Sequence, residues 1–214
     1  MPPVQRLFTI MTKPWVIMIY LGLLFLSFLY VDKPLALLIQ SHSLSANYPW
    51  FGFLTVLGEG KFYLVALLLI ALVFRYWVHH RLWGLRIWFL WLCVLIPNVI
   101  CVVLKVFLGR ARPELWFSEQ VYGFYGFHRD SSYWSFPSGH TTTIMGFVCG
   151  LSFLFPRHAW LYVVIGCAVV ASRILLLQHY LSDVMIAADL ALLEVGVLWL
   201  IFCRKACFSR PLVA

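Results

Sequence analysis

Three short stretches of the sequence combine cations, histidines and small residues in a way that suits binding of a tetrahedral oxyanion. They are "KVFLGRARP" at residues 105–113, "SFPSGHTTT" at 135–143 and "SRILLLQHYLSD" at 172–183. Lys105, Arg112 and Arg173 supply three positive charges. An arginine meets such an anion bidentately, whereas a lysine acts as a point charge.

Ser138 and Gly139 follow Pro137, where the pattern predicts the start of a helix. The N-terminus of a helix presents free backbone N–H groups and binds phosphate and sulfate readily. Ser138 adds a hydroxyl, and Gly139 allows those N–H groups to approach closely. We therefore expect both residues to help hold the anion.

His179 and Asp183 are four residues apart, so on a helix they share a face. A carboxylate bonded to one imidazole nitrogen fixes the tautomer and stabilises the positive charge that builds when the other nitrogen attacks. His140 lies two residues from Ser138, a spacing that disfavours a serine–histidine nucleophile pair, and no G-x-S-x-G is present. One histidine as nucleophile and a second as acid form a complete set for phosphoryl transfer.

The same stretches argue against a metal. Two-metal phosphatases need clustered Asp, Glu and His ligands. Here one His–Asp pair is surrounded by cations, which neutralise the charge that a metal would otherwise neutralise. We expect no metal and no cofactor.

The elements that position these residues are predicted to be membrane helices. Of the 214 residues, 63% are hydrophobic and 11% are charged, with a mean hydropathy of +0.91, whereas soluble domains are about half apolar and a quarter charged. A helix needs roughly 20 mostly apolar residues to cross a bilayer. Six runs qualify: Pro14–Val31, Phe62–Val78, Ile87–Phe107, Gly139–Phe155, Trp160–Leu177 and Val184–Cys203. The sequence thus predicts an all-α, six-helix transmembrane bundle that forms one domain over residues 1–214.

The charges predict the orientation of this bundle. With the N-terminus inside, the cytoplasmic segments hold nine of the sixteen basic residues and no acid, while the opposite side holds seven basic residues and six acids. The positive-inside rule then favours cytoplasmic termini. The three motifs fall together on the outer face, at the membrane–water boundary. The net charge of +8 does not indicate nucleic acid, because no run of five basic residues occurs.

The third motif also predicts a break in the chain. In an ideal helix Arg173 would lie about 120° around the axis from His179. Because both are expected at one site, we predict a turn between them, with Arg173 ending one crossing and His179 introducing the next.

The motifs together resemble those of the type-2 phosphatidic acid phosphatase superfamily. The resemblance rests on Lys105 and Arg112-Pro113 with six residues between them, on Pro137-Ser138-Gly139-His140, and on Ser172-Arg173 followed at matching spacings by His179 and Asp183. This superfamily includes lipid phosphate phosphatases, bacterial undecaprenyl diphosphate phosphatases and vanadium haloperoxidases.

The resemblance implies a role for each residue. His179 would be the nucleophile that forms a phosphohistidine, Asp183 would orient it, and His140 would protonate the leaving oxygen and later activate water. The phosphate oxygens would be held by Lys105, Arg112, Ser138, Gly139 and Arg173. The resemblance also implies that a phosphatase of this superfamily works without a metal.

We therefore expect a lipid phosphatase of the bacterial inner membrane. Four substrates fit equally: undecaprenyl diphosphate, phosphatidylglycerophosphate, phosphatidic acid and the 1-phosphate of lipid A. The alternatives are a lipid-to-lipid phosphotransferase, a haloperoxidase and a non-catalytic transporter of anionic lipids. The sequence does not indicate an oligomeric state.

Three other features have open interpretations. Asp189 and Glu194, inside the last apolar run, either form an ion pathway or pack against a polar group such as Asn98. The aromatic connection 108–138 is either an interfacial belt or the lining of a lipid entrance. The segment "GEGK" at 58–61 is interpreted as a glycine-rich turn.

Overall fold

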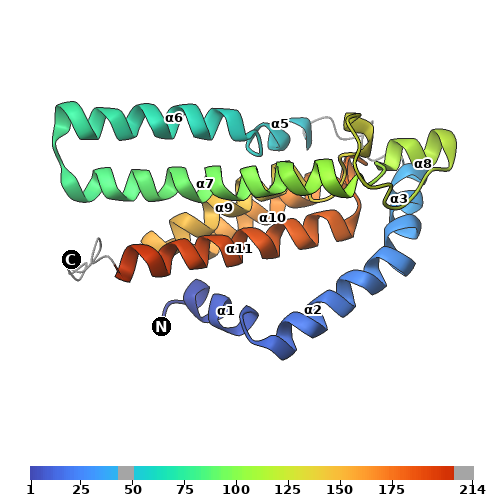
Figure 1. Ribbon diagram of the computed structural model, residues 1–214, viewed down its shortest axis with the longest axis horizontal. Coiled ribbons are helices and arrows are strands. Elements are labelled where there is room, and N and C mark those ends of the chain that lie inside the picture. The colour runs from blue at the N-terminus through green and yellow to red at the C-terminus, as the bar shows by residue number, and fades with distance from the viewer. Residues whose placement is uncertain (43–50, 205–214) are drawn as a thin grey trace.

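The protein is a bundle of long helices, described for residues 1–42 and 51–204 of a computed structural model (Figure 1). Five helices run side by side along the longest axis: α6 (Gly60–Val73), α7 (Arg81–Leu108), α9 (Gly139–Leu154), α10 (Ala159–Leu175) and α11 (Leu181–Arg204). Ahead of them come α1 (Pro3–Met11), α2 (Pro14–Leu26) and α3 (Asp32–Ser41). The predicted all-α class is confirmed.

Within residues 1–42 and 51–204, five helical segments are long and apolar enough to cross a membrane, as in a multi-pass membrane protein. They are Pro14–Ser41, Gly60–Val78, Arg81–Leu108, Pro156–Leu175 and Leu181–Arg204. The remaining predicted run forms α9, whose 16 residues extend only about 24 Å. A sixth crossing therefore stays a prediction.

Helix α9 lies at the centre of the bundle and packs against α7, α10 and α11. Small residues on α9 permit this close approach: a Cβ atom on Gly146 would collide with the backbone carbonyl of Cys93 in α7. Small interfacial residues are the usual means by which membrane helices pack closely. Because α9 is surrounded by other helices, it can be shorter than a helix that faces lipid along its whole length.

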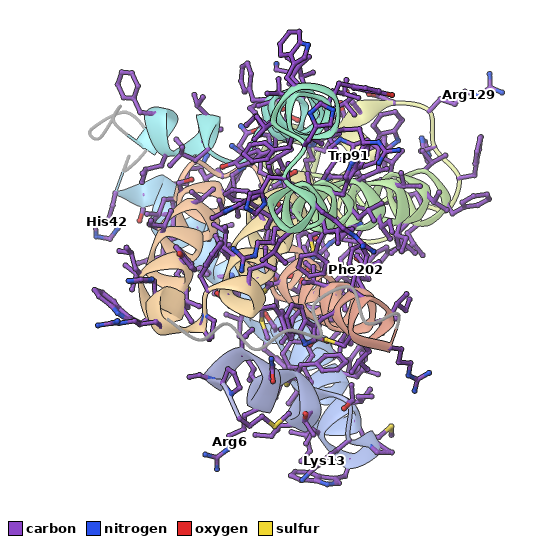
Figure 2. All side chains as sticks on the ribbon, turned by 90° about the vertical axis from the view of Figure 1, so that its left-hand side faces the viewer. Arg6, Lys13, His42, Trp91, Arg129 and Phe202 are labelled. Atoms are coloured by element: carbon purple, nitrogen blue, oxygen red, sulfur yellow. The ribbon has the colours of Figure 1, made fainter. Side chains whose placement is uncertain are left out.

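The first apolar run was predicted to end at Val31, but its helix continues to Ser41. A π-helical turn over Ser27–Val31 joins α2 to α3. The polar residue that suggested the boundary, Asp32, is 1% exposed and paired inside the protein. Its partner is the buried Arg110, which neutralises the carboxylate and allows the helix to continue past it. Helix α1 was not predicted; its Arg6 points away from the bundle (Figure 2).

The connection after α7 is an ordered cap of the bundle. Helix α7 ends at Gly109, whose φ of +54° is left-handed, and a Cβ atom there would collide with the carbonyl oxygen of Gly126. Glycine is the usual residue at such a helix end. The chain then forms α8 (Pro113–Glu119) and a single 3-10 turn, Ser131–Tyr133. Backbone hydrogen bonds from Ala111 to Gly123 and from Ser135 to Arg110 fold the cap onto itself.

Candidate active site

All eight predicted site residues lie at one end of the bundle, where α7 and α10 end and α9 and α11 begin. This end is on the right in Figure 1, beside α3 and α8. Helix ends from four different elements therefore form the site. The residues are Lys105, Arg112, Ser138, Gly139, His140, Arg173, His179 and Asp183.

The predicted break in the third motif is confirmed. Helix α10 ends at Leu175, Leu177 has a left-handed φ of +54°, and α11 begins at Leu181. The backbone N–H of Gln178 donates to the carbonyl of Arg173 at 3.1 Å and closes the turn. The turn is what allows Arg173 and His179 to belong to one site.

His179 is buried beside Asp183, with Nδ1 3.6 Å from Oδ2. This contact is longer than the expected hydrogen bond. The reason is that Oδ2 already accepts hydrogen bonds from the hydroxyl of Ser135 at 2.6 Å and the N–H of Tyr180 at 2.8 Å. Asp183 is thus held by several hydrogen bonds and faces Nδ1 of His179. Nε2 is therefore the ring nitrogen that Asp183 does not face.

Burial lowers the pKa of His179 to about 3, and the positive charge of Lys105 contributes to this while Asp183 opposes it. The imidazole is therefore neutral at physiological pH. A neutral imidazole has a lone pair available on one ring nitrogen, as a nucleophile requires.

Arg110 holds Asp183 in place, although it is not among the predicted site residues. It is completely buried and lies 2.5 Å from Asp183 and 2.7 Å from Asp32. It also donates to the hydroxyl of Ser182 at 2.7 Å. Burial works against its charge, but Asp183 and Asp32 more than offset this and raise the pKa of Arg110.

Aromatic rings enclose the Arg110 guanidinium, the nearest belonging to Tyr180 at 4.6 Å and Phe28 at 5.0 Å. Cation–π contacts of this kind stabilise a desolvated cation. Through Asp32, Arg110 also ties the first membrane segment to the site. One signal was available in the sequence: Asp32 is an acid at the end of an apolar run, and such acids need a partner.

The three predicted cations lie close together, and each donates a hydrogen bond to a neutral group of the protein. Lys105 donates to the backbone carbonyl of Trp134 at 2.7 Å, and Arg112 donates to Gln178 at 3.4 Å. Arg173 donates to Thr55 of α5 (Phe51–Val56) at 3.0 Å. Lys105 lies within electrostatic range of both Arg112 and Arg173.

These cations leave donors free for a ligand. The buried Nε atoms of Arg112 and Arg173 have no hydrogen-bond partner among the residues described. Unpaired buried donors are rare in native proteins and call for an explanation. Three mutually repelling cations with unused donors make a site that favours an anion.

The start of α9 is arranged as the sequence predicted. Ser138 is its N-cap, and its hydroxyl accepts from the N–H of Thr141 at 3.5 Å. Gly139 faces Lys105, since a Cβ atom there would lie 3.6 Å from the lysine Cε. His140 follows, with Nε2 3.3 Å from a carboxylate oxygen of Glu59. Glu59 belongs to the segment interpreted as a simple turn, and it too was missed.

The features left open by the sequence are partly resolved. Asn98 bonds to Thr143 and to the carbonyl of Val94, not to Asp189 or Glu194. One oxygen of each acid, Asp189 Oδ1 and Glu194 Oε2, is buried without a partner in the described part of the chain.

The aromatic connection forms the cap described above. Its Arg129 is exposed and points away from the molecule (Figure 2).

Two known proteins resemble part of this chain. It is 32% identical to a lipid A 1-phosphatase of Rhizobium johnstonii over 96 residues, 45% of this chain and 39% of that protein. It is 31% identical to a lipid A 1-phosphatase of Rhizobium etli over 96 residues, 45% of this chain and 41% of that protein. The chain thus spans about two fifths of the length of the curated relatives it matches. No solved structure matches the chain significantly.

A family model covers all eight predicted site residues. The model of the PAP2 superfamily matches residues 86–206, more than half of the chain. This range contains all eight predicted site residues and Arg110. With the three motifs brought together at one end of a helical membrane bundle, the chain belongs to the PAP2 superfamily.

Proposed function

We propose that the protein is a metal-independent phosphatase that hydrolyses a phosphate monoester or diphosphate carried by a membrane lipid. One observation supports this above all: three cations, two of them arginines with an unpaired Nε, a helix N-terminus and a buried neutral histidine meet at one end of a membrane bundle. The first two suit a phosphate group, and the third supplies a nucleophile. The position at the end of apolar helices suits a substrate with a hydrophobic tail.

The first chemical step is attack by Nε2 of His179 on phosphorus. The bond from phosphorus to the lipid oxygen breaks, its electron pair stays on that oxygen, and His140 donates a proton to it. Asp183, 3.6 Å from Nδ1, stabilises the positive charge that the phosphorylated imidazole acquires. Lys105, Arg112 and Arg173 stabilise the negative charge on the phosphate oxygens, the usual means of catalysis in phosphoryl transfer.

The second step releases inorganic phosphate. A water molecule gives a proton to His140 and attacks phosphorus, and the nitrogen–phosphorus bond breaks. His179 returns to its neutral form. Both steps use groups of this chain alone, so the proposed cycle needs no metal ion.

We propose that the site faces outward from the inner membrane and that both termini are cytoplasmic. The bundle end opposite the site holds five arginines: Arg75, Arg81, Arg86, Arg157 and Arg204. This distribution follows the positive-inside rule. A reporter enzyme that is active only outside the cytoplasm should stay inactive when fused to the C-terminus. An active fusion would contradict the orientation.

Purified protein in detergent, with EDTA present, should release phosphate from at least one of four lipids. These are the 1-phosphate of lipid A, undecaprenyl diphosphate, phosphatidylglycerophosphate and phosphatidic acid. Lipid A is tested first because of the relatives' names. His179→Ala should abolish release, and wild-type activity in this variant would contradict the mechanism. Phosphate recovered on an acceptor lipid instead of in solution would indicate a phosphotransferase.

A further inference from the structure

The segment that joins α5 to α6 lies directly against the predicted acid of the site. Gly58 packs on His140 so closely that a Cβ atom on Gly58 would lie 2.8 Å from the His140 Cβ and 2.9 Å from Cδ2. Glu59 places a carboxylate oxygen 3.3 Å from Nε2 of the same ring. Three residues before Gly58, Thr55 accepts a hydrogen bond from Arg173. This segment therefore contacts two site residues that come from other helices.

The local structure of Glu59 does not explain its orientation. Glu59 is the N-cap residue of α6, yet its side chain accepts no bond from the backbone of that helix. A side chain in this position ordinarily satisfies the first free N–H groups. The carboxylate instead lies between Lys61, at 3.2 Å, and His140. It is 33% exposed, while its partner imidazole is 25% exposed.

The charges around His140 make a carboxylate necessary if the ring is to carry a proton. Burial of the ring disfavours the imidazolium most, and the positive charges of Arg173 in α10 and Lys105 in α7 add to this effect. Glu59 is the negative group that faces it among the residues described. The arrangement matches the other histidine of the site, where Asp183 faces Nδ1 of His179.

We propose that Glu59 is a positioning residue that orients His140 and sustains its proton for transfer to the leaving oxygen. The inference rests on the proposed function, in which His140 is the acid. The proton passes from His140 to the lipid oxygen as the phosphorus–oxygen bond breaks, and Glu59 stabilises the imidazolium before this transfer. As an anion, Glu59 is not suited to binding phosphate, so its removal should affect mainly the steps that need the proton.

The test compares two leaving groups. An alkyl phosphate such as phosphatidic acid needs protonation of its leaving oxygen, whereas p-nitrophenyl phosphate does not. Above the pH at which His140 titrates, Glu59→Gln should reduce kcat on the lipid about tenfold. This is the effect expected when the pKa of a general acid falls by about one unit. On p-nitrophenyl phosphate the reduction should stay below about threefold. The basic limb of the kcat profile on the lipid should move to lower pH by about one unit, since loss of the carboxylate weakens proton binding.

Two variants serve as controls. Glu119→Gln removes the same charge from an exposed position at the end of α8 and should leave both activities unchanged. Glu59→Asp keeps a carboxylate and should restore part of the lost lipid activity. An equal loss on both substrates in Glu59→Gln, without movement of the basic limb, would overturn the inference.

A second measurement is independent of catalysis. The titration of His140 is followed by NMR in the full chain with labelled histidine, and Glu59→Gln should lower its midpoint by about one pH unit. An unchanged midpoint would overturn the inference. If the parent released no phosphate from any lipid, the proposed function would fail, but this titration would still decide whether Glu59 supports the proton on His140.

Discussion

Replacing Arg110 by methionine should strongly destabilise the protein, because two buried carboxylates would lose their common partner. The guanidinium lies 2.7 Å from Asp32 and 2.5 Å from Asp183, and all three side chains are inaccessible to solvent. Removing one partner of a buried ion pair costs about 3–5 kcal/mol, which lowers the midpoint of thermal unfolding by roughly 6–20 °C for a chain of this length.

The double variant that combines Arg110→Met with Asp32→Asn tests this explanation more directly. The second change removes one of the two stranded charges, so the double variant should unfold several degrees above Arg110→Met. Asp32→Asn alone should lower the midpoint, because it leaves Arg110 with one carboxylate. The two effects are therefore expected to be strongly non-additive, as they are for residues in one buried network.

Thermal unfolding in detergent, followed by circular dichroism, measures all three variants. Arg129→Met is the matched control: this arginine is exposed (Figure 2), and its loss should change the midpoint by no more than about 2 °C. If the double variant unfolded below both single variants, the explanation by uncompensated buried charge would be wrong.

Three further predictions concern single positions. Gly109→Ala should lower the unfolding midpoint, since a left-handed φ of +54° costs about 1–3 kcal/mol for residues other than glycine. Gly22→Ala is the control and should not lower the midpoint, because nothing lies within 4 Å of the added atom. Equal midpoints for the two variants would refute the argument. Ser138→Ala should cost about 1 kcal/mol through loss of the N-cap and should raise the KM for the lipid phosphate; an unchanged KM would remove Ser138 from the phosphate site. Lowering the pH from 7 to 4 should destabilise the parent more than His179→Gln, because the unfolded imidazole takes up a proton near pH 6.5 that the folded one refuses until about pH 3. An equal loss of stability in both proteins would show that His179 is not a buried neutral imidazole.

Much of the site was predictable because its signals are local. The cations of the first motif, the N-cap of α9 and the His179–Asp183 spacing each depend on residues close together in the chain. The break before His179 followed from helix geometry alone. Apolar length and charge bias were sufficient for an all-α membrane class.

The exact bounds of the helices were less predictable. Asp32 looked like the end of a membrane segment because an isolated carboxylate is costly in an apolar environment. Its helix continues because Arg110, 78 positions away, neutralises it. Helix α9, by contrast, begins as predicted and ends one residue before the predicted run does.

The sequence by itself therefore predicted which residues gather at the site, since its three motifs contain all eight of them. Their roles as phosphate ligands, nucleophile and acid follow from the resemblance and stay predictions. Only the tertiary structure decided what supports those residues. Arg110 binds both Asp183 and Asp32, and Glu59 reaches His140 from another segment. Neither pairing is visible in sequence, because each joins segments far apart in the chain whose contact depends on how the helices pack.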